Sequence, residues 1–403
     1  IKEKQFDNAN HVFEQAKKQG VDEGRLNALR AQLTSINKLK NVNSTAPSRD
    51  QLNRLMEFYQ NGKFPDAETL ALSLTQEYPA DSFAWKVLGA VLKQTGRMNE
   101  AVVASGKAVQ LEPQDAAAHS NLGVMLQELG RLEEAEGSLR QAIKLKPDFA
   151  EAYSNLGNTL KEMGRLEDAE GSLRQAIELK PELVEAHNNL GIIYRELRKL
   201  NESEASLRQA IALRADYAEA HSNLGVTLQK LARPDEAESS LRQAIALKPA
   251  FAEAHYNWGN ALQELGRLEE SEASVRQAIA FKPDFAEAHR HLTTIKKFDS
   301  QDEQYSKMLE LYLDEKISEE QRCHINFGLA KACEDLGDFE QAFTHYSEGN
   351  ISRKKLLNYN IDQDVELFRQ IKSSYPLILQ NTLKPDNFAE HPVPIFIVGM
   401  PRS

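Results

Sequence analysis

The sequence predicts an all-α protein built as a solenoid, in which pairs of antiparallel helices stack one after another. Two sequence motifs support this prediction, because HSNLG at 119–123 and SLRQAI at 138–143 both recur with small changes every 34 residues. Within each unit, apolar residues recur at helical spacing along two separate stretches. A fixed period of this length is typical of stacked supersecondary units.

Each unit is expected to hold two helices and a tight turn. With Ala116 as place 1, apolar or small residues fill places 4, 7, 8 and 11 of the first helix and places 20, 24, 27 and 28 of the second. Glycine at place 8 and alanine at place 27 predict close approach of the two helices. Glycines that take the left-handed conformation are expected to end the first helix, namely Gly130, Gly164 and Gly266.

The second helix is expected to end at proline, which lacks an N–H, at Pro147, Pro181, Pro249 and Pro283. Two units depart from this pattern of glycine and proline at the helix ends. Unit 184–217 carries Arg198 and Ala215 where glycine and proline are usual, and unit 218–251 carries Ala232 in its turn. We expect weaker local capping in these two units and the same fold.

The residues at places 4, 7, 8, 11, 20, 24, 27 and 32 together resemble the tetratricopeptide repeat. The resemblance implies a right-handed superhelix whose first helices line a concave groove that binds a protein or peptide. The chain then divides into an N-terminal helical segment and connector, seven repeats, a capping and a linker helix, a degenerate repeat, a linker and the start of a second domain. Their predicted ranges are 1–47, 48–285, 286–322, 323–354, 355–391 and 392–403.

Composition narrows the functional classes. The net charge of −11 argues against a nucleic-acid partner, and no apolar run is long enough for a membrane-spanning helix. The N-terminal residues have no apolar core of a secretion signal. Cys323 and Cys333, if on one helix, would lie roughly 15 Å apart, too far for a disulfide. We therefore expect reduced thiols in a cytoplasmic protein, and leave oligomerisation open.

Histidines at place 4 raise the question of a metal site. They are His119, His187, His221, His255 and His289. Successive helix pairs stack at roughly 10 Å, whereas ligand bonds to a metal are about 2 Å long. We therefore predict that these rings pack between repeats, and expect no metal.

Asparagines fill place 6 in five successive repeats, at Asn121, Asn155, Asn189, Asn223 and Asn257. An asparagine amide can both donate to and accept from a peptide unit. A row of them with a step of about 10 Å would match roughly three residues of extended chain. The row resembles that of O-GlcNAc transferase, which implies binding of a peptide backbone. The alternative is that these asparagines only pack.

Repeated charges are the remaining regular feature. Glutamate fills place 2 and arginine fills place 25, and such rows are most simply solvated residues or interhelical ion pairs. Repeats that capture the acidic C-termini of chaperones use basic residues at concave places. Here those places hold glutamate, serine and asparagine. The sequence therefore opposes that type of clamp.

The composition changes near the C-terminal end. The run 395–398, IFIV, predicts a buried strand, and GMPRS follows it at 399–403. The run lacks the second glycine and the lysine of the common nucleotide-binding P-loop. It resembles the 5′-phosphosulfate loop of sulfotransferases, an α/β fold similar to P-loop proteins. The resemblance implies that Gly399, Arg402 and Ser403 bind 3′-phosphoadenosine 5′-phosphosulfate. The alternative is an ordinary terminal strand.

The sequence therefore predicts the substrate-recruiting region of a sulfotransferase that acts on a hydroxyl acceptor. One alternative is a non-catalytic scaffold that binds extended peptides, and another is a glycosyltransferase like O-GlcNAc transferase. The chain shows no general base and only part of a cofactor site, so we expect residues 1–403 alone to be inactive.

Overall fold

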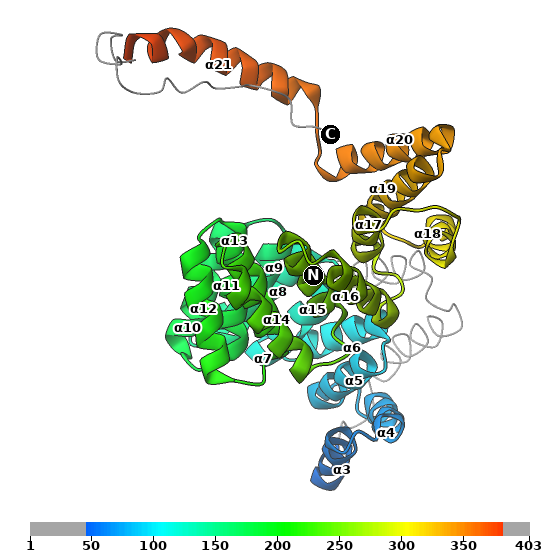
Figure 1. Ribbon diagram of the computed structural model, residues 1–403. Coiled ribbons are helices and arrows are strands. Elements are labelled where there is room, and N and C mark those ends of the chain that lie inside the picture. Colours follow the sequence, from blue (N-terminus) through cyan, green and yellow to red (C-terminus); the bar gives the residue numbers. More distant parts are fainter. Residues whose placement is uncertain (1–45, 382–403) are drawn as a thin grey trace. The chain divides into compact units, whose positions relative to one another are not determined.

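The computed structural model of the protein describes residues 46–381, and the regular structure in this range consists of helices (Figure 1). This confirms the predicted all-helical fold for the repeats. The N-terminal helical segment and the predicted strand at 395–398 lie outside the described residues. The chain divides into two compact units between Leu265 and Gly266, inside the seventh repeat. Each unit is described by itself.

The first unit consists of helix pairs that stack in chain order, coloured from blue to green in Figure 1. From α3 to α14, each first helix packs on the second helix of its own pair. The described helices are α3 (Arg49–Gln60), α4 (Phe64–Glu77), α5 (Ser82–Gln94), α6 (Met98–Leu111), α7 (Ala116–Glu128), α8 (Leu132–Leu145), α9 (Ala150–Glu162), α10 (Leu166–Leu179), α11 (Val184–Glu196), α12 (Leu200–Leu213), α13 (Ala218–Lys230), α14 (Pro234–Leu247) and α15 (Ala252–Glu264).

Left-handed residues form the turn within each pair. Gly130 and Gly164 have φ of 71° and 75°, as predicted from their place in the repeat. Arg198 and Ala232 take the same conformation with φ of 63° and 57°. A side chain in this region costs roughly 1–2 kcal/mol. The two irregular units therefore keep the turn and bear a local strain for it.

Close packing inside each pair depends on the glycine at place 8. A Cβ added to Gly157 would lie 2.6 Å from Cγ of Leu173, which is fully buried. The same clash, at 2.5–2.6 Å, would arise between Gly123 and Leu139 and between Gly225 and Leu241. The alanines at place 27 are also fully buried, at Ala142, Ala176, Ala210 and Ala244. The prediction that small residues allow close approach is confirmed.

Histidine and tryptophan rings at place 4 join their first helices to the end of the preceding repeat. A ring nitrogen of His187 lies 2.8 Å from the carbonyl oxygen of Pro181, and the indole N–H of Trp85 donates to the carbonyl of Pro79 at 3.1 Å. Four further histidines make the same contact six residues back, at His119, His221, His255 and His289. The predicted structural role of these histidines is confirmed.

First helices of neighbouring repeats contact one another directly. Such contacts join α7 to α9, α9 to α11, α11 to α13 and α13 to α15. Residues at one place of the repeat are therefore brought onto one continuous surface of the first unit. We call this surface, formed by the first helices α5 to α15, the groove face.

The second unit consists of α16 (Leu268–Phe281), α17 (Ala286–Ile295), α18 (Glu303–Leu313), α19 (Glu319–Leu336), α20 (Phe339–Leu356) and α21 (Ile361–Asn381). The degenerate repeat predicted at 323–354 is the pair α19 and α20, which join at Gly337 with φ of 81°. Its first helix begins earlier than predicted, because Ser318 and Gln321 form a capping box. Helix α21 lies in the segment predicted as a linker.

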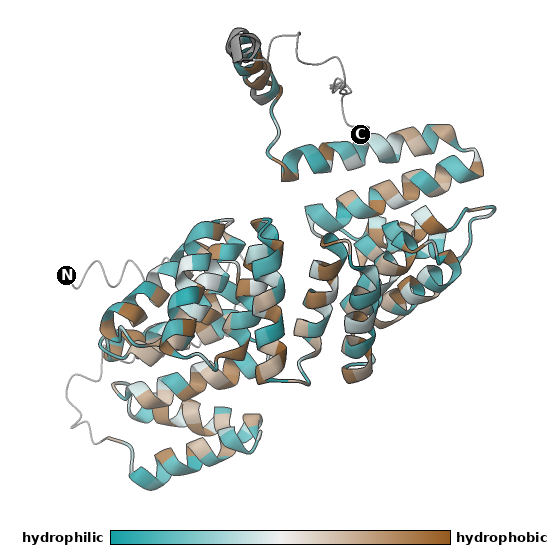
Figure 2. Cartoon of the chain, turned by 60° about the vertical axis from the view of Figure 1, so that its left-hand side comes forward, coloured by the Kyte–Doolittle hydropathy of each residue, from teal (hydrophilic) through white to brown (hydrophobic). Residues whose placement is uncertain are grey.

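The core of the second unit gathers Phe298, Met308, Ile325 and Leu329 around α17, α18 and α19. Cys323 and Cys333 lie on the same helix, and both are free and buried, as predicted. In contrast, α20 leaves large apolar side chains in solvent: Phe339 is 71% exposed and Phe343 is 74% exposed. Figure 2 shows hydrophobic residues in brown interspersed with hydrophilic ones in teal along the helices.

Candidate functional site

The five predicted asparagines lie at the same position of five consecutive first helices, α7, α9, α11, α13 and α15. Because these helices are neighbours, the asparagines share the groove face. The side chain of Asn121 is exposed, and those of the other four are half-buried. The structure thus brings the predicted row together on the groove face.

The five asparagines differ in whether their side-chain amides form hydrogen bonds within the protein. Within residues 46–381, the side chains of Asn121 and Asn155 have no hydrogen-bond partner in the protein. In contrast, the side-chain N–H of Asn257 donates to Oγ of Ser222 in the preceding repeat at 3.2 Å. The first two asparagines therefore have their full donor and acceptor capacity available to a ligand.

A connected network occupies the middle of the row. Arg195 donates to Oδ1 of Asn223 at 3.4 Å, and Asn223 donates to Oδ1 of the buried Asn188 at 3.0 Å. Asn188 in turn donates to Oδ1 of Asn189 at 3.2 Å. The bonds of Asn223 cross between repeats, the bond of Asn189 lies within its own helix, and together they orient both side chains. Loss of Asn223 would leave a buried amide short of a partner, which is costly.

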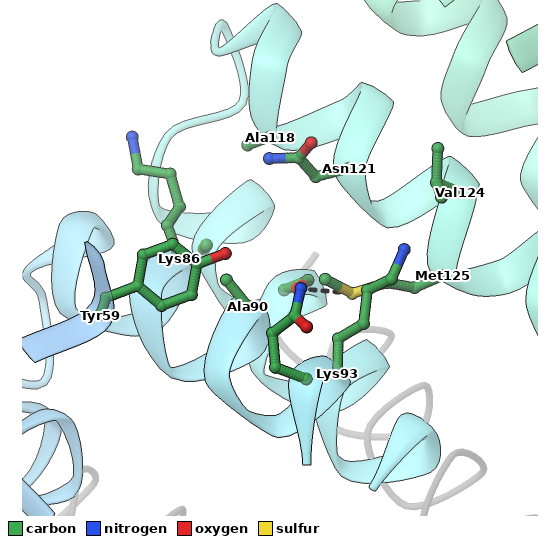
Figure 3. A pocket seen from close by; sticks show the side chains of 11 residues that line it. Tyr59, Lys86, Ala90, Lys93, Ala118, Asn121, Val124 and Met125 are labelled. Atoms are coloured by element: carbon green, nitrogen blue, oxygen red, sulfur yellow. Dashed lines mark hydrogen bonds between the residues drawn. The ribbon is translucent and has the colours of Figure 1, made fainter. Parts of the chain in front are cut away.

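A cavity of about 230 Å³ opens beside Asn121 at the start of the groove face (Figure 3). Its wall includes Tyr59 of α3, Lys86 and Lys93 of α5, and Val124 of α7. Figure 3 shows the amide of Asn121 among these residues. The cavity combines an aromatic ring, two ammonium groups and a free amide, which suits a peptide side chain.

Both lysines of this cavity are paired with acids further along the chain, those of Lys86 in its own repeat and that of Lys93 in the next. Nζ of Lys86 lies 2.7 Å from Asp115 and 3.0 Å from Glu112. Burial by itself would lower the pKa of Lys86, but the bonds to the two acids outweigh it and raise that pKa. Lys93 pairs with Glu128 at 2.6 Å. These cations are therefore already neutralised within the protein.

The two repeated charge rows form separate kinds of ion pair. Glutamates at place 2 pair with a cation at the end of the second helix, as in Glu151 with Lys180 at 2.7 Å and Glu219 with Lys248 at 2.9 Å. Arginines at place 25 pair within their own helix, as in Arg140 with Glu136 at 2.8 Å. Both rows are partly exposed, so each pair stabilises the fold little.

One cluster in the second unit could hold a divalent cation. A ligand atom from each of Glu287, Glu320 and His324 lies within 4.8 Å of the others. Nδ1 of His324 is buried without a hydrogen-bond partner among the described residues. Burial, the largest influence, lowers the pKa of His324, and Arg290 acts in the same direction. The nearby arginine also opposes a cation. Sequence analysis missed this cluster, because its residues come from α17 and α19.

Sequence analysis also missed Asn188 and Arg195. Asn188 stands at place 5, where neighbouring repeats carry Ser154 and Ser222. Comparing that place across repeats would have singled it out. The predicted cofactor residues Gly399, Arg402 and Ser403 lie outside the described residues.

Comparison with known families bears on the repeats. The profile described as the C-terminal domain of cilia and flagella-associated protein 70 matches residues 45–226. A tetratricopeptide-repeat profile matches residues 222–286. Tetratricopeptide repeats are thus supported over residues 45–286. None of the curated proteins compared with it matches.

Solved structures agree with this fold. A tetratricopeptide repeat protein from Parabacteroides merdae is 15% identical with a TM-score of 0.53, over 61% of this chain and 97% of that one. A chain of the anaphase-promoting-complex hetero-tetramer Cut9–Hcn1 is 16% identical with a TM-score of 0.50, over 79% of this chain and 58% of that one. At these identities the likeness concerns the fold alone.

No helix within residues 46–381 combines the length and the apolar character that crossing a membrane requires.

Proposed function

We propose that the groove face of these tetratricopeptide repeats binds an extended peptide segment of a partner protein. The observation that supports this most directly is the asparagine row on neighbouring first helices, with two amides, Asn121 and Asn155, free of partners within the described residues. Amides with both donor and acceptor capacity can hydrogen-bond to N–H and C=O groups of a peptide backbone. Such binding depends little on the peptide's side chains.

Orientation of the other asparagines supports the same function. Asn188 holds both neighbours, since it donates to Asn189 in its own helix and accepts from Asn223 in the next repeat, so a ligand need not order them on binding. Side chains already fixed in position reduce the entropic cost of association. The free amides of Asn121 and Asn155 and the fixed amides beyond them would together contact a segment that crosses several repeats.

The test replaces Asn121 and Asn155 together by alanine in the full chain. The probe is a fluorescein-labelled peptide selected from a display library of random 12-residue sequences, and anisotropy gives its affinity. We expect about 25-fold weaker binding, because two hydrogen bonds of about 1 kcal/mol each are lost. Melting should stay unchanged, since neither side chain is bonded within the described residues.

The control is Asn201→Ala, which removes an exposed asparagine from α12, outside the groove face. Its affinity should equal that of the unaltered protein. Unchanged peptide binding by the double variant would contradict the proposal. Asn223 is unsuitable for this test, because its loss would also disturb Asn188.

We propose further that the array recruits substrates for sulfate transfer from 3′-phosphoadenosine 5′-phosphosulfate to a hydroxyl group. The support is the sequence IFIVGMPRS at 395–403, which follows the repeats and resembles the 5′-phosphosulfate loop. In this proposal the cofactor supplies the sulfuryl group. The guanidinium of Arg402 would bind anionic oxygens in a bidentate manner, and Ser403 would donate its hydroxyl.

The assay uses the full-length product of the gene with labelled cofactor and measures sulfate incorporation and nucleotide binding. We expect Arg402→Ala to abolish both, while Arg369→Ala, which removes an exposed charge from α21, leaves both intact. Tight nucleotide binding that survives Arg402→Ala would exclude this loop from the mechanism. Peptide binding without sulfate transfer would favour the scaffold, and transfer from a sugar nucleotide would favour the glycosyltransferase alternative.

A further inference from the structure

Place 12 of each first helix on the groove face lies next to place 13 of the following first helix. Lys93 bonds to Glu128 at 2.6 Å, Gln127 to Glu162 at 2.8 Å, and Gln229 to Glu264 at 3.5 Å. All three contacts span 35 residues and join neighbouring repeats. We call each such pair of positions a rung.

One rung breaks this pattern. Four of the five rungs between α5 and α15 carry glutamate at the second position: Glu128, Glu162, Glu196 and Glu264. The rung between α11 and α13 carries Arg195 and Lys230 instead. The register of the other rungs therefore places two cations together where the rest of the row has a cation or an amide beside an acid.

Neither cation is neutralised within the described residues. Within residues 46–381, no carboxylate lies within ion-pair distance of Arg195 or Lys230. Arg195 turns instead to Asn223, contacting its main-chain carbonyl and Oδ1 at 3.4 Å each. The neighbouring Glu196 comes next along the helix, and adjacent residues of a helix do not face each other.

Partial burial makes the unpaired charge of Arg195 energetically unfavourable. Its side chain is half-buried, and loss of water around it lowers the pKa of the guanidinium, with only Glu196 acting in the opposite direction. A half-buried charge without a counter-ion is unfavourable unless a ligand supplies one. Lys230 is exposed at the end of α13.

We infer that Arg195 and Lys230 bind a carboxylate of the peptide that occupies the groove face, an inference that rests on the proposed peptide binding. Arginine can grip a carboxylate through two parallel hydrogen bonds, and Lys230 adds a second charge. The asparagine row binds backbone at any register. The other rungs each hold a glutamate. The single rung with two cations therefore fixes which residue of an extended ligand lies at α11 and α13.

The experiment compares peptides that differ in one side chain. Twelve-residue fluorescein-labelled peptides of serine and alanine, amidated at the C-terminus, carry either one glutamate or one glutamine at the centre. A third peptide is neutral with a free C-terminal carboxylate. Anisotropy is measured with the full chain and with Arg195→Gln, Lys230→Glu and Lys161→Gln, at low and at high salt.

We expect the glutamate peptide to bind about tenfold more tightly than its glutamine partner, and the preference to shrink at high salt. Arg195→Gln should reduce the preference, and Lys230→Glu should abolish it by restoring an acid to the rung. Lys161→Gln removes the same charge from the preceding rung and should leave the preference unchanged. If the free-carboxylate peptide alone gains affinity, the carboxylate recognised is a C-terminal one.

Equal affinity for the glutamate, glutamine and free-carboxylate peptides would overturn the carboxylate site while leaving backbone binding intact. A preference that persists in both Arg195→Gln and Lys230→Glu would also overturn it. If none of the peptides binds, the inference and the proposed peptide groove both fail. Circular dichroism of each variant confirms that it remains folded.

Discussion

The first unit and the second unit bury side chains by different rules. In the first, each repeat places leucine, alanine and glycine at the same points, such as Leu173 beneath Gly157. In the second, α17 and α19 bury His289, His291 and Asn326 among their apolar residues. Both units bury polar groups, but in the periodic interior most are small hydroxyls such as Thr227, whereas the irregular one depends on several imidazole and amide groups that must stay neutral or bonded.

The largest expected effect comes from a substitution that creates a cavity in the core of either unit. Leu173 in α10 and Leu329 in α19 are both fully buried, so replacing either by alanine should cost roughly 2–5 kcal/mol of unfolding free energy. Because a solenoid repeat contacts mainly its neighbours, Leu173→Ala should accelerate amide exchange around α9 to α11. Hydrogen-exchange mass spectrometry would locate the effect of each variant. Faster exchange throughout both units after either change would contradict this separation.

The second-largest expected effect is a difference between the two units in how much stability they lose as pH falls. Burial lowers the pKa of His291 from 6.5 to about 4 and also lowers that of His345. A histidine whose pKa is lowered by folding stays neutral in the folded protein while it becomes protonated in the unfolded chain. The folded state therefore keeps its full stability above the unfolded pKa of 6.5 and loses stability as pH drops from 6.5 through about 4. The loss at His291 would reach roughly 3 kcal/mol.

In the first unit, the acids with lowered pKa include Glu136, where bonds from Arg140 and Arg165 outweigh burial. Its contribution is lost only as pH falls below the ordinary value of 4.5. At pH 5 we therefore expect faster amide exchange, after correction for intrinsic rates, in the second unit alone. His291→Asn, which installs the residue usual at place 6, should reduce this acid sensitivity. Equal loss of protection in both units at pH 5 would refute the contrast.

The smallest effect concerns the irregular turns of the first unit. Arg198 and Ala232 hold left-handed conformations, so replacing each by glycine should stabilise the chain by up to about 1 kcal/mol. Chemical denaturation would measure the gain. Glycine at Leu231, which is not left-handed, serves as the matched control and should destabilise. A loss of stability on Arg198→Gly would mean that the arginine side chain offsets the strain.

Periodicity determined what could be predicted. The helix pairs, the place-8 packing and the shared face of the five asparagines follow from residues that recur every 34 positions. The hydrogen bonds of Asn189 and Asn223 could not be foreseen, since they depend on one substitution at Asn188. The cluster of Glu287, Glu320 and His324 escaped prediction because packing of α17 on α19 has no period to reveal it. The phosphosulfate loop remains a prediction.

The bond between each place-4 histidine and a carbonyl six residues earlier has a consequence for how the chain acquires its structure. Each new helix pair can attach to the one before it through partners that are near in sequence, without waiting for a distant segment. Chains dominated by such short-range contacts have low contact order and fold rapidly. The array can therefore assemble one repeat at a time from its N-terminal side during synthesis.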